Sequence, residues 1–177
     1  MSTADARTPN AAGSLIASSE APFQLSAGEI DQIRHEMEHY VDPRAATIEA
    51  LKCVQRHRGW VPDGAIAAIG AVLGLPASDV EGVATFYNMI FRRPVGRHVI
   101  MVCDSISCFL TGYDELHAAI ASHTGLAHGE TSADGRFTLL PVCCLGNCDK
   151  GPTLMIDNDT HGPVAPGEVP ALLERYA

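Results

Sequence analysis

Two groups of cysteines constrain this chain more than any other feature, because each group directly follows a short apolar run. The groups are Cys103 and Cys108, where Cys103 ends the run HVIMVC, and Cys143, Cys144 and Cys148 after the run FTLLPV. Apolar runs of this length, rich in β-branched residues and bounded by turn residues, predict strands. If the two strands are parallel neighbours, their carboxyl ends meet at one edge of the sheet, and both groups come together there.

The spacing of these cysteines predicts a site with four thiolates. Cys103 and Cys108 form one close pair (C-x4-C), and Cys144 and Cys148 form a second (C-x3-C). Four thiolates bind either a [2Fe-2S] cluster or a structural zinc ion, and the spacing leaves both open, although zinc sites more often use C-x2-C. Gly146 beside the second pair, with Gly151 and Gly112 nearby, would let the backbone approach an inorganic core. A Rieske-type centre is excluded, because no histidine lies within either cysteine loop.

The remaining cysteines have simpler interpretations. Adjacent residues of an extended segment point to opposite sides, so we expect Cys144 to face the site and Cys143 to pack inward. Cys53 lies in a predicted helix far from the others and is expected to be a core residue. His35 and His39 are one helical turn apart, and we expect a solvated surface there.

Before residue 92 the pattern is that of a helical bundle with four helices. Apolar residues recur at helical spacing, and Ser26 with Glu29 matches a capping box. Further helix starts are predicted at Asp42-Pro43, Pro62-Asp63 and Pro76, and helix ends at Gly59 and Gly74. We expect the segment from Ala84 to Tyr87 to pack in the core, with one edge exposed to solvent.

After about residue 95 the pattern becomes that of an α/β unit. Strands are predicted over 98–103, 137–142 and 153–156, helices over 111–122 and 166–176, and a hairpin loop over 157–162. The predicted class is therefore α+β. We divide the chain into a flexible tail (1–22), a helical bundle domain (23–95) and an α/β domain (96–177).

Composition excludes several classes of function. The chain has 177 residues and a net charge of -9 with no Lys/Arg cluster, which argues against nucleic acid as a partner. The longest small or apolar run, Ala65 to Leu75, is too short to span a bilayer, and the first 20 residues lack the apolar core of a signal peptide. We therefore expect no direct membrane insertion, a cytoplasmic protein and reduced thiols rather than a disulfide framework.

Three separated segments carry a family resemblance. The segments GWVPDGAIAAIGAVLGLPASDVEGVATFYNMI, VGRHVIMVCDSISC and LLPVCCLGNCDKGP occur in this order, and together they resemble the family of the E subunits of NADH-quinone oxidoreductase. Members of this family are the small [2Fe-2S] peripheral-arm subunits of bacterial respiratory complex I. The resemblance runs from about Phe23 to the C-terminus. One departure is Cys143, at a position where the family often has an acid.

The resemblance implies a fold, a cofactor and partners. It implies a thioredoxin-like ferredoxin domain after the helical bundle, with one [2Fe-2S] cluster held by Cys103, Cys108, Cys144 and Cys148. It implies single-electron exchange with the FMN of a neighbouring subunit, which also binds NADH, within the proton-translocating NADH:quinone oxidoreductase. Other peripheral-arm iron-sulfur subunits would be further partners, and the assembled complex would hold the chain at the cytoplasmic face of the inner membrane. We find no nucleotide cradle such as G-x-G-x-x-G, so no substrate site is expected on this chain.

Alternative functions differ in partners or in chemistry. An equivalent diaphorase subunit of a soluble NAD-dependent formate dehydrogenase or hydrogenase shares these motifs and would keep the same cluster. A thiol-disulfide oxidoreductase would need C-x2-C at a helix start, whereas this chain has C-x4-C. A zinc-stabilised interaction module would be colourless and redox-silent.

Overall fold

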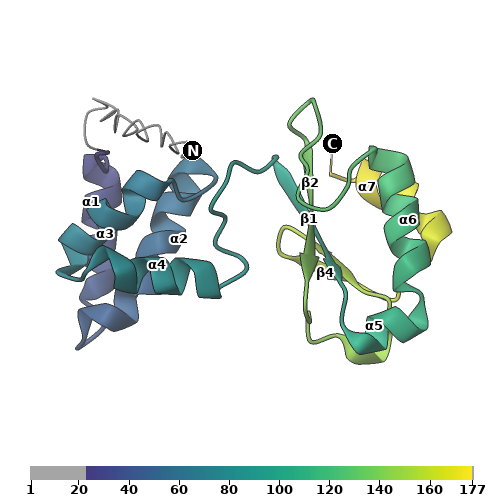
Figure 1. Cartoon of the computed structure of the whole chain (residues 1–177), viewed down its shortest axis with the longest axis horizontal. Helices are drawn as coiled ribbons and strands as arrows, with labels where there is room; N and C mark the ends of the chain where they lie inside the picture. Colours follow the sequence, from purple (N-terminus) through teal and green to yellow (C-terminus); the bar gives the residue numbers. More distant parts are fainter. Residues whose placement is uncertain (1–22, 177) are drawn as a thin grey trace, which may run out of the picture.

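The computed structural model describes residues 23–176, so the predicted tail (1–22) lies outside the described residues. Helices come first along the chain, and a four-stranded sheet with its own helices follows. In Figure 1 the sheet lies between the first group of helices and the helices of the second unit. The predicted α+β class is confirmed.

The first unit consists of four α-helices and one short 3-10 helix. They are α1 (Ala27–Met37), the 3-10 helix Pro43–Ala46, α2 (Thr47–Arg58), α3 (Asp63–Leu73) and α4 (Ala77–Phe86). The predicted stops at Gly59 and Gly74 are confirmed, since both adopt the left-handed conformation after α2 and α3. The predicted helix start at Asp42-Pro43 begins the 3-10 turn instead, so that α2 starts at Thr47.

A single apolar core holds these helices together, and Cys53 is fully buried in it, as predicted. The core interpretation of Ala84 to Tyr87 is wrong for the aromatic residues, because Phe86 is 80% exposed and Tyr87 is 44% exposed. The reason is local: α4 ends at Phe86 and Tyr87 has extended backbone angles, so both lie beyond the face of α4 that buries Val80 and Ala84.

A buried ion pair joins the start of α1 to the end of α2. The Glu29 side chain is 1% exposed and accepts hydrogen bonds from Arg58 Nε (2.5 Å) and Nη2 (2.6 Å). Glu29 also completes the capping box of α1, accepting from the Ser26 backbone N–H at 2.7 Å. These hydrogen bonds, above all those from the Arg58 guanidinium, lower the pKa of Glu29 from 4.5 to about 2.

The second unit is built on a sheet with strand order β2-β1-β3-β4. The strands are β1 (His98–Cys103), β2 (Phe137–Val142), β3 (Leu154–Ile156) and β4 (Asp159–His161). β1 and β2 are parallel, and their register pairs Cys103 with Val142, so the loops after both strands leave the same edge. β3 and β4 pair antiparallel, which places a short strand inside the segment predicted as a hairpin loop.

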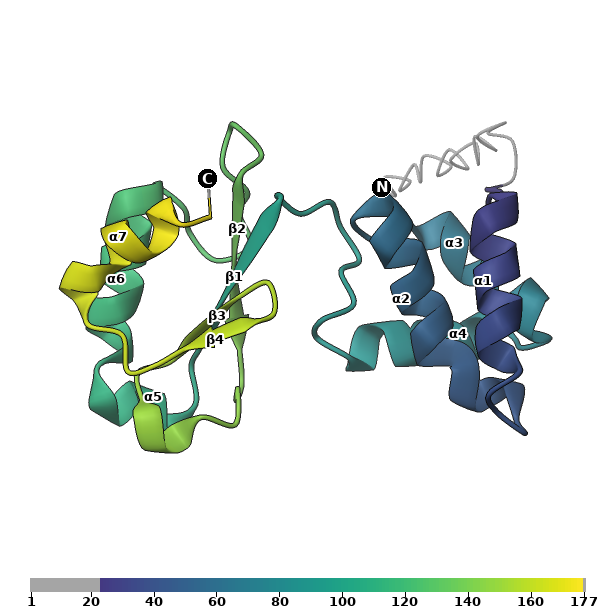
Figure 2. The same cartoon turned by 180° about the vertical axis from the view of Figure 1, so that it is seen from behind.

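Helices cover one face of this sheet. The linker between α4 and β1 (residues 87–97) covers part of the other face. Figure 2 shows α6 (Tyr113–Thr124) and α7 (Val169–Glu174) on the face that points away from the first unit. Ile100 and Val102 of β1 face these helices, whereas Val99 and Met101 pack against Phe91 and Val95 of the linker. The alternation of a strand thus assigns each β1 side chain to one of two cores.

Replacing Glu29 with Gln removes the charge that Arg58 needs and should lower the free energy of unfolding by about 3 kcal/mol at neutral pH. Because the folded-state pKa is lowered, this stability is present above pH 4.5 and is lost as the pH falls toward 2. Urea unfolding followed by circular dichroism at several pH values measures the difference between wild type and Glu29→Gln.

The matched control is Glu49→Gln, because Glu49 pairs with Lys52 on the surface of α2 at 2.9 Å. Exposed pairs of this kind contribute about 0.5 kcal/mol or less. A Glu29→Gln effect as small as that of the control, or one that does not shrink in acid, would contradict the assignment.

Candidate metal centre

The parallel strands bring the predicted cysteines to one end of the sheet. Cys103 is the last residue of β1, and Cys108 lies in α5 (Ile106–Thr111), the short helix of the same loop; both are buried. Cys144 and Cys148 lie in the loop after β2 and are exposed. The backbone N–H of Asp104 donates to Val142 O at 3.0 Å, so the β1–β2 pairing continues to the start of both loops.

Two of the sulfur atoms are direct neighbours. Cys144 Sγ and Cys148 Sγ are 3.8 Å apart, close to the separation of about 3.8 Å that follows for two thiolates bound tetrahedrally to one ion at about 2.3 Å. Cys103 lies near enough to influence the pKa of the Cys108 and Cys144 thiols. Within residues 23–176, no group of three or more His, Cys, Asp or Glu side chains is arranged to hold a single metal ion.

The two loops give their thiols different electrostatic environments. Burial raises the pKa of the Cys108 thiol, and the nearby Cys103 thiol acts in the same direction. The backbone N–H of Gly146 donates to Cys144 Sγ at 3.4 Å and lowers the pKa of that thiol. The neighbouring Cys144 raises the pKa of Cys148. An N–H donor at Cys144 favours the thiolate, which is the form that binds metals.

The expected inward packing of Cys143 is wrong, because its side chain is exposed. β2 ends at Val142, so the alternation of a strand no longer applies to Cys143 and Cys144, and both side chains reach the surface. The carbonyl oxygen of Cys143, and not its thiol, contacts the first cysteine loop: it lies 3.9 Å from Cys103 Sγ.

Glycines let the loops pack closely around the thiols. A Cβ atom at Gly151 would lie 2.5 Å from Thr111 Oγ1 and 3.5 Å from the Cα of Cys108. Gly146 has a φ of +74°, a conformation that other residues rarely adopt. The sequence pointed to both Gly146 and Gly151, and the structure shows that Gly151 makes its close approach to α5.

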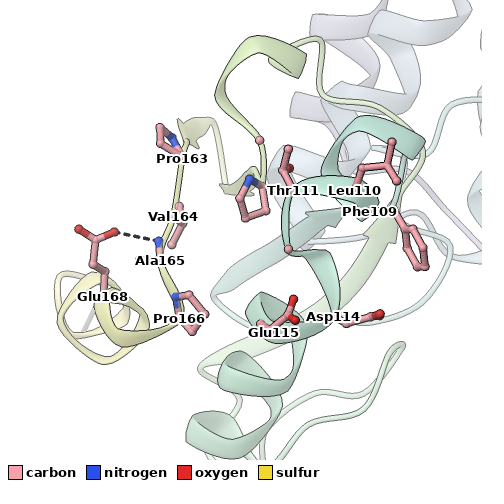
Figure 3. Close-up of a pocket in the computed structure, with 13 residues that line it drawn as sticks. Phe109, Leu110, Thr111, Asp114, Glu115, Pro163, Val164, Ala165, Pro166 and Glu168 are labelled. Atoms are coloured by element: carbon pink, nitrogen blue, oxygen red, sulfur yellow. Dashed lines mark hydrogen bonds between the residues drawn. The ribbon is translucent and has the colours of Figure 1, made fainter.

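The surface beside the thiols is apolar on α5 and concave next to it. Ile106, Phe109 and Leu110 of α5 are 68%, 53% and 77% exposed. Figure 3 shows Phe109 and Leu110 at the edge of a pocket of about 890 Å³, which also contains carboxylates from Asp114, Glu115 and Glu168. The side chains that line this pocket include no Lys, Arg or His, which disfavours phosphate binding there.

The family model described as thioredoxin-like [2Fe-2S] ferredoxin matches residues 33–177. The chain belongs to this family. The E subunits of NADH-quinone oxidoreductase from Escherichia coli and Pseudomonas aeruginosa are 65% and 66% identical to this chain over 154 residues. Each alignment covers 87% of this chain and 93% of the relative, so the resemblance to the E subunits is confirmed.

A solved structure of an NAD+-reducing [NiFe]-hydrogenase shares the fold. Its TM-score is 0.60 at 22% sequence identity, and the match covers 71% of this chain. This chain spans about a fifth of the length of that hydrogenase chain (22%). Among the helices of residues 23–176, none is long and apolar enough to cross a membrane.

Gly151→Ala should disturb the thiol loops, because the new methyl group would displace Thr111 Oγ1 from its hydrogen bond to Ser107 O (2.9 Å) or push α5 outward. Overpacking of this kind costs about 1–3 kcal/mol. We expect a melting temperature lower by several degrees and less than the wild-type iron content per chain, measured by calorimetry and iron analysis.

Gly167→Ala is the control, since a Cβ atom there meets nothing within 4 Å. It should leave both quantities unchanged. Wild-type iron content and melting temperature in Gly151→Ala would show that the close approach at α5 is unimportant.

Proposed function

We propose that Cys103, Cys108, Cys144 and Cys148 bind one [2Fe-2S] cluster. The observation that carries this assignment is the parallel pairing of β1 and β2, which brings the four thiols to one end of the sheet. A [2Fe-2S] core takes four thiolates shared between two irons, and two close pairs in adjacent loops suit such a core. The buried pair excludes water on one side, while the exposed pair leaves the site accessible.

Like the E subunits to which it is similar, the chain is an electron-transfer component of NADH-quinone oxidoreductase and carries one [2Fe-2S] cluster. The cluster supplies one-electron chemistry when bound. The residues of this chain hold the ligand loops at the sheet edge, and the Gly146 N–H stabilises negative charge on Cys144 Sγ. Enzyme activity belongs to the whole complex.

The partner in our proposal is the subunit that binds FMN and NADH, with other peripheral-arm iron-sulfur subunits in the same complex. Electron exchange requires that subunit to approach the thiol end of the sheet, where the exposed side chains of Ile106, Phe109 and Leu110 form an apolar surface. We place the chain at the cytoplasmic face of the inner membrane through the assembled complex.

The division into a bundle domain (23–95) and an α/β domain (96–177) is also part of the proposal. It is supported by separate apolar cores, one within the first unit and two on the faces of the sheet. The linker side chains Phe91 and Val95 pack on the sheet, so the two domains would share a small contact.

The test of the cofactor assignment is anaerobic purification with absorption, iron and sulfide analysis, and EPR after reduction with dithionite. We expect a brown protein with about two irons per chain and a spin-half signal. Each of Cys103→Ala, Cys108→Ala, Cys144→Ala and Cys148→Ala should lose this signal, because each removes a ligand.

Cys143→Ala and Cys53→Ala are the controls and should keep the wild-type spectrum. If Cys143→Ala loses the cluster and Cys144→Ala keeps it, Cys143 is the ligand in place of Cys144. A colourless wild-type protein that contains zinc would overturn the assignment.

Co-purification separates the two candidate assemblies. The affinity-tagged chain should co-purify with a membrane-bound NADH-oxidising complex that reduces quinone. Recovery with a soluble NAD-dependent formate dehydrogenase or hydrogenase would favour the alternative instead.

A further inference from the structure

Thr153 lies between the two cysteine loops, one residue before β3, and its side chain is 1% exposed. Its backbone contacts the first cysteine loop. The carbonyl oxygen accepts a hydrogen bond from the Cys103 N–H at 3.1 Å. The main chain at Thr153 therefore fixes Cys103 relative to β3.

The side chain of Thr153 contacts the other cysteine loop. Oγ1 donates to Lys150 O at 2.8 Å and accepts from Asn147 Nδ2 at 3.3 Å. Asn147 precedes the 3-10 turn Cys148–Lys150 and Lys150 ends it, and the Lys150 N–H donates to Asn147 O at 3.0 Å. One buried hydroxyl thus holds the turn that begins with Cys148.

Gly162, in a third segment of the chain, packs against the atoms that the Thr153 hydroxyl joins. A Cβ atom there would lie 2.5 Å from Thr153 Oγ1 and 2.9 Å from Asn147 Nδ2, and it would also clash with Lys150 O. A side chain at this position would therefore displace the Thr153 hydroxyl or the turn, so the contact requires glycine.

We propose that Thr153 is a positioning residue for the cluster, whose main-chain carbonyl holds Cys103 while its hydroxyl holds the turn of Cys148. This proposal rests on the ligand set proposed above. Residues that support metal ligands without touching the metal typically change metal affinity by about 10- to 100-fold when replaced. Anchoring both loops on one buried residue keeps the distance between the two sulfur pairs constant.

The test is Thr153→Val in the full chain, because valine keeps a similar shape and the main-chain hydrogen bond to Cys103 and removes only the hydroxyl. We expect the visible absorbance of the cluster to disappear about tenfold faster in the presence of an iron chelator. We also expect altered EPR g values and a shifted midpoint potential. Thr153→Ser restores the hydroxyl and should restore all three quantities.

Thr138→Val is the matched control for loss of a buried threonine hydroxyl. Thr138 is 2% exposed, and its Oγ1 bonds Thr131 Oγ1 at 2.7 Å and the Gly96 N–H at 2.6 Å. It lies near the start of β2, at the opposite end of the sheet from the cysteines. It should lower the melting temperature while keeping the wild-type chelation rate, g values and midpoint potential.

The outcomes separate this proposal from the proposed function. A wild-type protein without a cluster would overturn the function itself. A wild-type protein with a cluster, together with Thr153→Val at the wild-type chelation rate and g values, would overturn only the role of Thr153. Equal cluster loss in Thr153→Val and Thr138→Val would also overturn it, because the effect would then follow general destabilisation.

Discussion

The parallel pairing of β1 and β2 is the constraint on which the thiol site depends. Its register places Cys103 opposite Val142, so the loops that carry the two cysteine pairs leave the sheet at the same level. A slip of one residue would turn every side chain of one strand to the other face. The buried residues Ile100, Val102 and Leu139 prevent such a slip, because they would leave the core beneath α6 and α7. The packing that fixes the register of the sheet therefore also fixes where the two cysteine loops begin.

Residues from outside the sheet cover the face that carries Cys103. Cys103 shares its face with Val99 and Met101, and Phe91 and Val95 of the linker pack against this face. Arg92 holds the linker to the bundle, because it bonds Val61 O, Asp63 and Glu81. The bundle thus contributes to the thiol site indirectly, by fixing the linker that covers the apolar surface beside it.

The sequence predicted the strands that carry the cysteine loops better than it predicted the loops themselves. β1 and β2 matched their predicted bounds, because β-branched runs end abruptly at turn residues. α5 went unpredicted, since six residues are too few for a helical period to be recognised. The orientation of Cys143 was wrong for a related reason: alternation holds within a strand, and β2 had already ended. The role of Thr153 depends on contacts between distant segments, which no local pattern records.

The difference in burial between the two cysteine pairs reflects two demands on an electron carrier. A metal core needs ligands that water cannot easily displace, and in the proposed ligand set buried Cys103 and Cys108, anchored on β1 and α5, would meet that demand. It also needs a surface that a partner can approach, and exposed Cys144 and Cys148 lie on that side. An exposed loop is free to move, so its position must be fixed by contacts beneath it. The buried hydroxyl of Thr153 and the close approach of Gly162 provide such contacts, which explains why polar and backbone atoms fill this part of the interior.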